Sequence, residues 1–89
     1  MKIEFDPAKQ NWTAENRGLD MARANEIFSG KTLTVADDRR DYGEQRFITI
    51  GFLEARMVVL VWTPRVGARR IISLRKANER EQKIYASRF

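Results

Sequence analysis

The chain has 89 residues, 43% of them hydrophobic, and a net charge of +5 at pH 7, which predicts one small domain, residues 1–89, built around a modest core. It contains no cysteine and no histidine, which excludes disulfides and thiolate metal sites and leaves no imidazole to bind zinc or to activate a nucleophile. The longest apolar run, Met57–Trp62, is too short to cross a bilayer, and the first residues lack the apolar core of a secretion signal, so we expect a cytoplasmic protein without a membrane segment, a metal or another cofactor.

The first third of the chain predicts a short strand and two helices. Residues 2–5 alternate polar and apolar side chains, and Asp6-Pro7 then supplies a helix cap and a first helical residue. The first helix is expected over residues 7–17, because Gly18 can adopt the left-handed conformation that closes a helix. Asp20 is expected to cap a second helix, which Ser29-Gly30 ends. The residues that share one face of this second helix are Met21, Ala24, Ile27 and Phe28.

The rest of the chain predicts four strands and a last helix. The strands are expected at residues 32–35, 45–52, 57–63 and 69–75. The first is short enough for an edge strand, and the other three form a meander. Because the run 57–62 is apolar throughout, its strand should be central and covered on both faces. Asn78 and Glu81 have the spacing of a capping box, so a helix is expected over residues 78–87.

The order β-α-α-β-β-β-β-α predicts an α+β fold with a mostly antiparallel sheet. The two N-terminal helices should pack on one face of that sheet, with a third helix at the C-terminus. Side chains along a strand alternate between the two faces. Regular alternation would place Arg69, Ile71, Ser73 and Arg75 on one side of the last strand, and Arg70, Ile72 and Leu74 on the other.

Positive charge is concentrated in the last third of the chain. Residues 65–89 hold eight basic side chains against two acidic ones, whereas residues 1–64 have a net charge of −1. Such a localised patch is typical of a surface that meets phosphate. Arginine suits this task because its planar fork donates two parallel hydrogen bonds and stays charged. The alternative is a solvated basic edge that keeps the sheet from pairing with neighbouring molecules.

Two further features allow more than one interpretation. The loop at residues 37–44 mixes carboxylates with arginines, which is compatible with magnesium binding but favours a loop that is salt-bridged to the basic strand, because no dedicated metal pattern is present. Tyr85 lies on the last helix. Its phenol can donate to a phosphate or stack on a base, or its ring can pack against the sheet. Glu81 is interpreted as a cap.

Three segments resemble motifs of a known family, and the resemblance runs from about residue 3 to residue 85. The segments are Phe5-Asp6-Pro7-Ala8-Lys9, Asp41-Tyr42-Gly43-Glu44 with Arg46, and Arg70-Ile71-Ile72-Ser73 with Arg75-Lys76-Ala77, Glu81 and Tyr85. They are similar to motifs of the BrnT family of bacterial toxins. The resemblance implies a RelE-like fold and a metal-independent endoribonuclease that inhibits translation in the bacterial cytoplasm. It also implies a BrnA-like antitoxin that forms a hetero-oligomer, a heterotetramer, with the toxin and alone contacts operator DNA.

Metal-independent RNA cleavage uses the 2′-hydroxyl as an internal nucleophile and leaves a cyclic phosphate. We expect Arg70 and Arg75 to stabilise the charge on the scissile phosphate, Lys76 to act as the base and Tyr85 as the acid. Glu44 and Glu79 are alternative bases. The side chains expected to bind the rest of the RNA are Arg46, Arg69, Ser73 and Arg80.

Two other functions fit the same residues. One is a non-catalytic module that contacts only the nucleic-acid backbone. The other is a degenerate toxin that serves only as partner of its antitoxin and as co-repressor. The second rests on a departure from the family pattern, because many relatives carry Lys-His-Gly where this chain has Asn16-Arg17-Gly18.

Overall fold

The computed structural model describes all 89 residues. Its elements are β1 (Lys2–Glu4), α1 (Pro7–Arg17), the 3-10 turn η1 (Met21–Arg23), α2 (Ala24–Ser29), β2 (Leu33–Ala36), β3 (Phe47–Leu53), β4 (Arg56–Arg65), β5 (Ala68–Lys76) and α3 (Glu79–Ala86). The predicted α+β class and the order of strands and helices are confirmed. The RelE-like arrangement of the helices stays a prediction. No helix is long and apolar enough to cross a membrane.

The five strands form one mixed sheet in the order β1-β5-β4-β3-β2. β1 runs parallel to β5, and the other neighbours are antiparallel. β4 is therefore the central strand and β2 an edge strand, as their residue patterns predicted. β1 pairs only with the first residues of β5, at positions 68–70, so the rest of the outer edge of β5 has no strand beside it.

The predicted caps of the first and last helices are confirmed. Asp6 accepts a hydrogen bond from the Ala8 amide at 3.0 Å, and Gly18 closes α1 with a φ of 66°. At the other end of the chain, Asn78 and Glu81 form the complete capping box of α3. The second predicted helix differs, because it begins as the 3-10 turn η1 and becomes α-helical only at Ala24.

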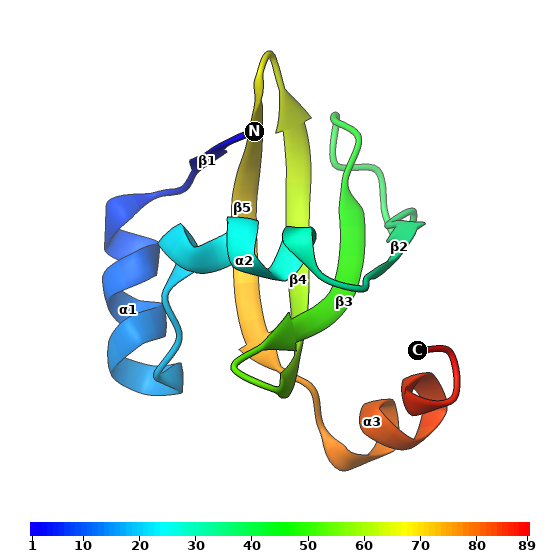
Figure 1. Cartoon of the computed structure of the whole chain (residues 1–89). Coiled ribbons are helices and arrows are strands. Elements are labelled where there is room, and N and C mark those ends of the chain that lie inside the picture. The colour runs from blue at the N-terminus through cyan, green and yellow to red at the C-terminus, as the bar shows by residue number, and fades with distance from the viewer.

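The main core lies on the face of the sheet that α2 covers, which we call the helix face (Figure 1). Met21, Ala24 and Ile27 from η1 and α2 are fully buried there. They pack in one cluster with strand residues that include Val58, Leu60, Ile71 and Leu74. α1 contacts β5 and lies beside that edge of the sheet (Figure 1).

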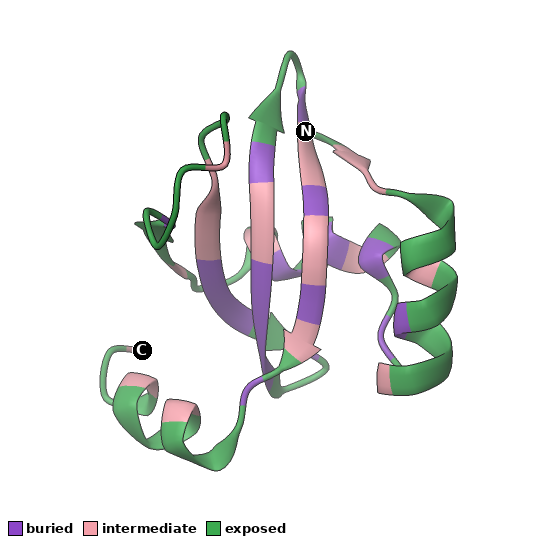
Figure 2. Cartoon of the chain, turned by 180° about the vertical axis from the view of Figure 1, so that it is seen from behind, coloured by how far each residue is buried: buried purple, intermediate pink, exposed green.

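The opposite face, which we call the hollow face, carries a smaller apolar cluster. Ile50, Met57, Val59 and Ala77 form it, and Tyr85 and Phe89 pack against it from the C-terminal segment. No helix crosses the strands in the view of this side, and α3 is largely exposed beyond the end of the sheet (Figure 2). The strands of the hollow face are therefore not covered by a helix.

A β-bulge in β5 corrects the predicted alternation of its side chains. The register shifts between Val61 and Trp62, which pair with Ser73 and Ile71, so Ile72 has no partner on β4. Paired residues on neighbouring strands point to the same face. Ile71 therefore lies on the helix face with Leu74, as its burial confirms. The predicted grouping of Arg69 and Ile71 with Ser73 and Arg75 is wrong, because one extra residue reverses the alternation between them.

Candidate phosphate-binding site

A hollow of about 360 Å³ lies on the hollow face, and we call it the arginine hollow. Its floor is apolar and comes from β3 and β4, with Ile48, Ile50, Val59 and Val61. Its polar side chains come from four separate segments. They are Arg17 of α1, Arg39 of the β2–β3 loop, Ser73 and Arg75 of β5, and Glu81 and Tyr85 of α3. Three guanidinium groups thus line one cavity, with a single carboxylate among them.

Arg75 is held by Glu81 in a bidentate ion pair. Both Nη atoms donate to the carboxylate at 2.7 Å. The hydrogen bond from Arg75 and the hydrogen bond from the Asn78 amide hold the pKa of Glu81 down to about 2, and Glu81 in turn raises the pKa of Arg75. The Arg75 side chain remains 41% exposed. Its guanidinium is therefore fixed in direction yet accessible from the cavity.

Arg39 has a carboxylate partner of its own, Asp37. The Nε and Nη2 atoms of Arg39 donate to Asp37 at 2.7 and 2.9 Å. This pairing is the main cause that lowers the pKa of Asp37 to about 2, and the Tyr42 hydroxyl adds a hydrogen bond at 3.3 Å. The loop carboxylates Asp37 and Glu44 are thus used in ion pairs. The expected partner was the basic strand, but the observed partners are Arg39 and Arg46 of the loop itself and Arg65 at the end of β4.

Arg17 enters the cavity from the end of α1. Its Nη1 atom donates to the Leu74 carbonyl at 2.9 Å, which is accessible because β1 does not extend along this part of β5. Its guanidinium also lies 4.8 Å from the centre of the Trp12 ring. The position of Arg17 relative to β5 could not be predicted from the residue pattern, because 57 residues separate it from Leu74. The only signal for it was the departure from Lys-His-Gly at this point.

The structure brings some of the predicted site residues together. Arg75, Ser73 and Tyr85 all line the arginine hollow. Arg70 pairs with Thr63 and so faces the same side of the sheet as Ser73, although it is not part of the lining. The β4 partners of Arg70 and Arg75, Thr63 and Val59, are four residues apart, so the backbone positions of the two arginines are separated by roughly 13 Å. The bulge thus places both predicted phosphate ligands on one face.

Four predicted site residues lie elsewhere. Arg69 lies on the helix face, with its guanidinium 4.0 Å from the Phe28 ring and 5.3 Å from that of Trp62. Arg46 pairs with Glu44 at 3.1 Å. Arg80 is exposed on the first turn of α3. Lys76 pairs with Val58 and so points to the helix face, away from Arg75.

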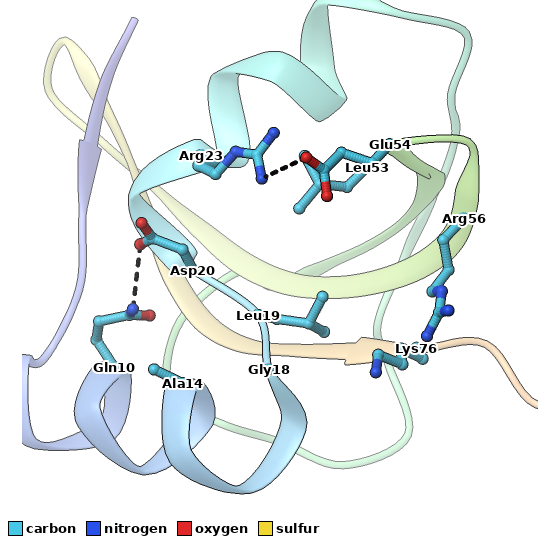
Figure 3. A pocket seen from close by; sticks show the side chains of 10 residues that line it. All are labelled: Gln10, Ala14, Gly18, Leu19, Asp20, Arg23, Leu53, Glu54, Arg56 and Lys76. Atoms are coloured by element: carbon cyan, nitrogen blue, oxygen red, sulfur yellow. Dashed lines mark hydrogen bonds and ion pairs between the residues drawn. The ribbon is translucent and has the colours of Figure 1, made fainter.

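Lys76 lines a different and larger hollow of about 560 Å³, between α1, η1 and the β3–β4 hairpin (Figure 3). Its lining mixes acidic with basic side chains. Arg23 pairs with Glu54 at 3.4 Å, and Asp20 accepts a hydrogen bond from Gln10 at 3.1 Å. Figure 3 shows Arg56 and Lys76 at one end, apart from these pairs. Since size without a concentration of one charge gives no preference for phosphate, we place the candidate site in the arginine hollow.

An α+β chain with three guanidiniums and a phenol around one cavity defines a protein suited to bind the phosphates of a nucleic acid. Comparison with known families then gives a specific assignment. Residues 5–81 match the family described as "Ribonuclease toxin, BrnT, of type II toxin-antitoxin system". The chain therefore belongs to the BrnT family, whose members are ribonuclease toxins with an antitoxin partner. No curated protein matches the chain with significant similarity.

Proposed function

We propose that this protein is a metal-independent endoribonuclease that inhibits translation, with the arginine hollow as its active site. The observation that carries the proposal is the convergence of Arg17, Arg39 and Arg75 on one cavity that also contains the Tyr85 phenol. Backbone phosphates of RNA are the ligands that such a set of donors suits best. Family membership supports the ribonuclease activity, and the geometry supports the choice of site.

In the proposed reaction, the 2′-hydroxyl oxygen of one nucleotide attacks its own 3′-phosphorus. The bond from phosphorus to the 5′-oxygen of the next nucleotide breaks, and a 2′,3′-cyclic phosphate and a 5′-hydroxyl are formed. Arg75 stabilises the negative charge that builds up on the phosphate oxygens, and removing one such preorganised donor costs about 3–4 kcal/mol of barrier. Arg70, which lies on the same face outside the lining, binds the adjoining phosphate and aligns the RNA backbone. Tyr85 gives the leaving 5′-oxygen its proton.

The 2′-hydroxyl proton needs an acceptor, and the hollow offers only one carboxylate. Glu81 has a pKa of about 2 because Arg75 binds it, which makes it a weak base, and Lys76 lies on the other face. The proposal therefore assigns Glu81 to holding Arg75 and passes the 2′-hydroxyl proton to solvent. Catalysis then rests on alignment of the backbone and on charge stabilisation.

The test is cleavage of single-stranded RNA by the purified protein in the presence of EDTA. We expect fragments with cyclic phosphate and 5′-hydroxyl ends, and growth arrest when the protein is expressed alone. Arg75→Ala should reduce cleavage by about 100- to 1000-fold, and Arg70→Ala should also reduce it, whereas Lys83→Ala on the exposed side of α3 controls for the loss of one charge. If both arginine variants cut as fast as the wild type while folded, the site assignment is wrong.

A second candidate function follows from the lack of a strong base in the hollow. Here the protein binds RNA through the same arginines but does not cut it, and acts in the cell as a partner of its antitoxin. RNA would then be retarded in a gel without cleavage, and expression would cause no growth defect. In either case we propose that a BrnA-like antitoxin covers the cationic hollow, since an acidic segment complements its charge; for the nuclease, this contact neutralises the toxin.

A further inference from the structure

We propose that Arg39 is a further phosphate-binding group of the active site, in the same cavity as Arg75, and that Asp37 is the residue that positions it. The inference rests on the proposed function, because it takes the arginine hollow to be the RNA site. The sequence predicted RNA binding by Arg46 of the β2–β3 loop, with Glu44 as an alternative base, but no role for Arg39 in the site. In the folded protein this loop delivers one of the three guanidiniums that line the cavity.

The burial of the two partners is unequal. The Asp37 side chain has no exposed surface, whereas that of Arg39 is 66% exposed. Besides the two bonds from the guanidinium, the Asp37 carboxylate accepts from the Arg39 amide at 3.4 Å and from the Tyr42 hydroxyl at 3.3 Å. The Tyr42 ring in turn lies 4.0 Å from the Arg46 guanidinium. The carboxylate is thus fixed from several sides, and it fixes the Arg39 fork.

Stability alone does not account for this arrangement. The bonds to Asp37 favour its charged form, as the lowered pKa shows, but that stabilisation does not require a guanidinium that is largely exposed at the rim of a cavity. What the pair does achieve is a guanidinium with a defined direction at the rim of a cavity. Preorganised donors of this kind are effective at a phosphate because they need no reorientation when charge develops.

Arg39 and Arg75 share the same design. Each has a carboxylate behind it, Asp37 for one and Glu81 for the other, and each lines the arginine hollow. The positive charge of Arg39 is also felt at Arg75, where it opposes the effect of Glu81 on the pKa. Two like charges held toward one cavity repel each other, and a bound phosphate relieves that repulsion.

Arg40 provides a matched control for Arg39. It is the next residue of the same loop and has the same charge, but it forms no ion pair and does not line the hollow. Its guanidinium lies 5.8 Å from the Tyr42 ring, on the exposed loop. A contribution from net charge alone would be the same for both arginines, whereas a positioned phosphate contact belongs to Arg39 only.

The first experiment compares RNA cleavage by Arg39→Ala and Arg40→Ala under single-turnover conditions. We expect Arg39→Ala to reduce kcat/KM by about 100-fold, and Arg40→Ala to reduce it by no more than about threefold, the effect of one surface charge. Arg39→Ala leaves the buried Asp37 carboxylate without its main partner, so its thermal unfolding midpoint should be lower than that of Arg40→Ala. Cleavage is therefore compared at a temperature at which both variants are fully folded. Equal losses for the two variants would overturn the proposal.

The second experiment tests Asp37 with the variant Asp37→Asn, whose net charge is one unit more positive. A diffuse electrostatic role predicts equal or tighter RNA binding and unchanged cleavage. Positioning predicts the opposite for the chemical step, namely a kcat about tenfold lower with little change in KM. Asp37→Asn should have no further effect on cleavage in the Arg39→Ala background, because Asp37 acts through Arg39. Additive losses in the double variant would contradict that role.

Failure of the inference and failure of the proposed function give different results. If the wild-type protein does not cut RNA, the nuclease proposal fails, and the same variants are compared for binding of an oligonucleotide with 2′-deoxy sugars. A shared phosphate site then predicts binding about tenfold weaker for Arg39→Ala than for Arg40→Ala. Equal binding by the two variants would exclude Arg39 from the site whatever the wild type does to RNA.

Discussion

Glu81 binds Arg75 and caps helix α3 with the same carboxylate. Its Oε1 accepts from Arg75 Nη1 at 2.7 Å and from the Asn78 amide at 2.9 Å, while its Oε2 accepts from Arg75 Nη2 at 2.7 Å. Beyond this pair, α3 and the C-terminal end pack on the sheet mainly through Tyr85 and Phe89. The placement of a helix that supplies the site's only phenol thus depends on the arginine that we assign to the phosphate.

Replacing Glu81 by Gln tests this dual role through stability. Glutamine retains the capping-box geometry but loses the charge that pairs with Arg75. We expect the free energy of unfolding, measured in urea, to fall by about 0.5–1 kcal/mol. Glu79→Gln is the control, since Glu79 is exposed on the same turn and makes no side-chain hydrogen bond. A loss no larger than that of the control would show that the pair with Arg75 contributes nothing.

Stability should also depend on pH through Glu81 and Asp37. Both carboxyls have a folded-state pKa of about 2, below their unfolded values of roughly 4. The unfolded chain therefore binds more protons in this range, and the stabilisation that is complete above about pH 5 is lost as the pH falls toward 2. We expect the double variant Asp37→Asn/Glu81→Gln to show a shallower fall in urea midpoint than the wild type between pH 5 and 3. Parallel curves would contradict the assigned pKa shifts.

Local signals in the sequence predicted much of the fold. The helix caps at Asp6, Gly18 and Asn78 act between residues close in the chain, and the apolar run of β4 indicates burial on both faces. Such features depend on neighbouring residues alone. The sequence could therefore give the element order and the central strand, with boundaries displaced by one or two residues.

The site was harder to predict, because its geometry depends on contacts distant in the chain. The β-bulge at the unpaired Ile72 places Arg70 and Arg75 on one face, and no residue pattern in β5 indicates that bulge. Arg17 reaches the hollow only because β1 is short, and Arg39 only because its loop returns over the sheet. The basic strand that the sequence predicted therefore included Arg75. Arg17 and Arg39, which come from other segments, were not predicted as part of the site.

Gly51 provides a test of the packing between α2 and the sheet. A Cβ atom at this position would lie 2.7 Å from Ile27 Cγ2 and 3.2 Å from Thr32 Cγ2, and Ile27 is fully buried. We expect Gly51→Ala to lower the free energy of unfolding by about 1–3 kcal/mol through overpacking. Gly30→Ala is the matched control, because its nearest contact would be an ordinary 3.7 Å. Similar unfolding midpoints for the two variants would mean that α2 shifts freely on the sheet.

Arg69 and Arg70 are adjacent in β5 but lie on opposite faces of the sheet. Their replacement by alanine should therefore affect different properties, stability for Arg69 and RNA cleavage for Arg70. The Arg69 guanidinium lies over Phe28 and Trp62 on the helix face, and its Nε is buried without a hydrogen-bond partner. Such cation–π contacts contribute about 0.5–2 kcal/mol. Arg69→Ala should therefore lower the free energy of unfolding more than Arg70→Ala does, whereas Arg70→Ala should lower the cleavage rate of the folded protein more. Urea unfolding and RNA cleavage, measured on the same preparations, give both orders. Finding the larger loss of cleavage in Arg69→Ala would place the RNA on the helix face and reject the arginine hollow as the active site.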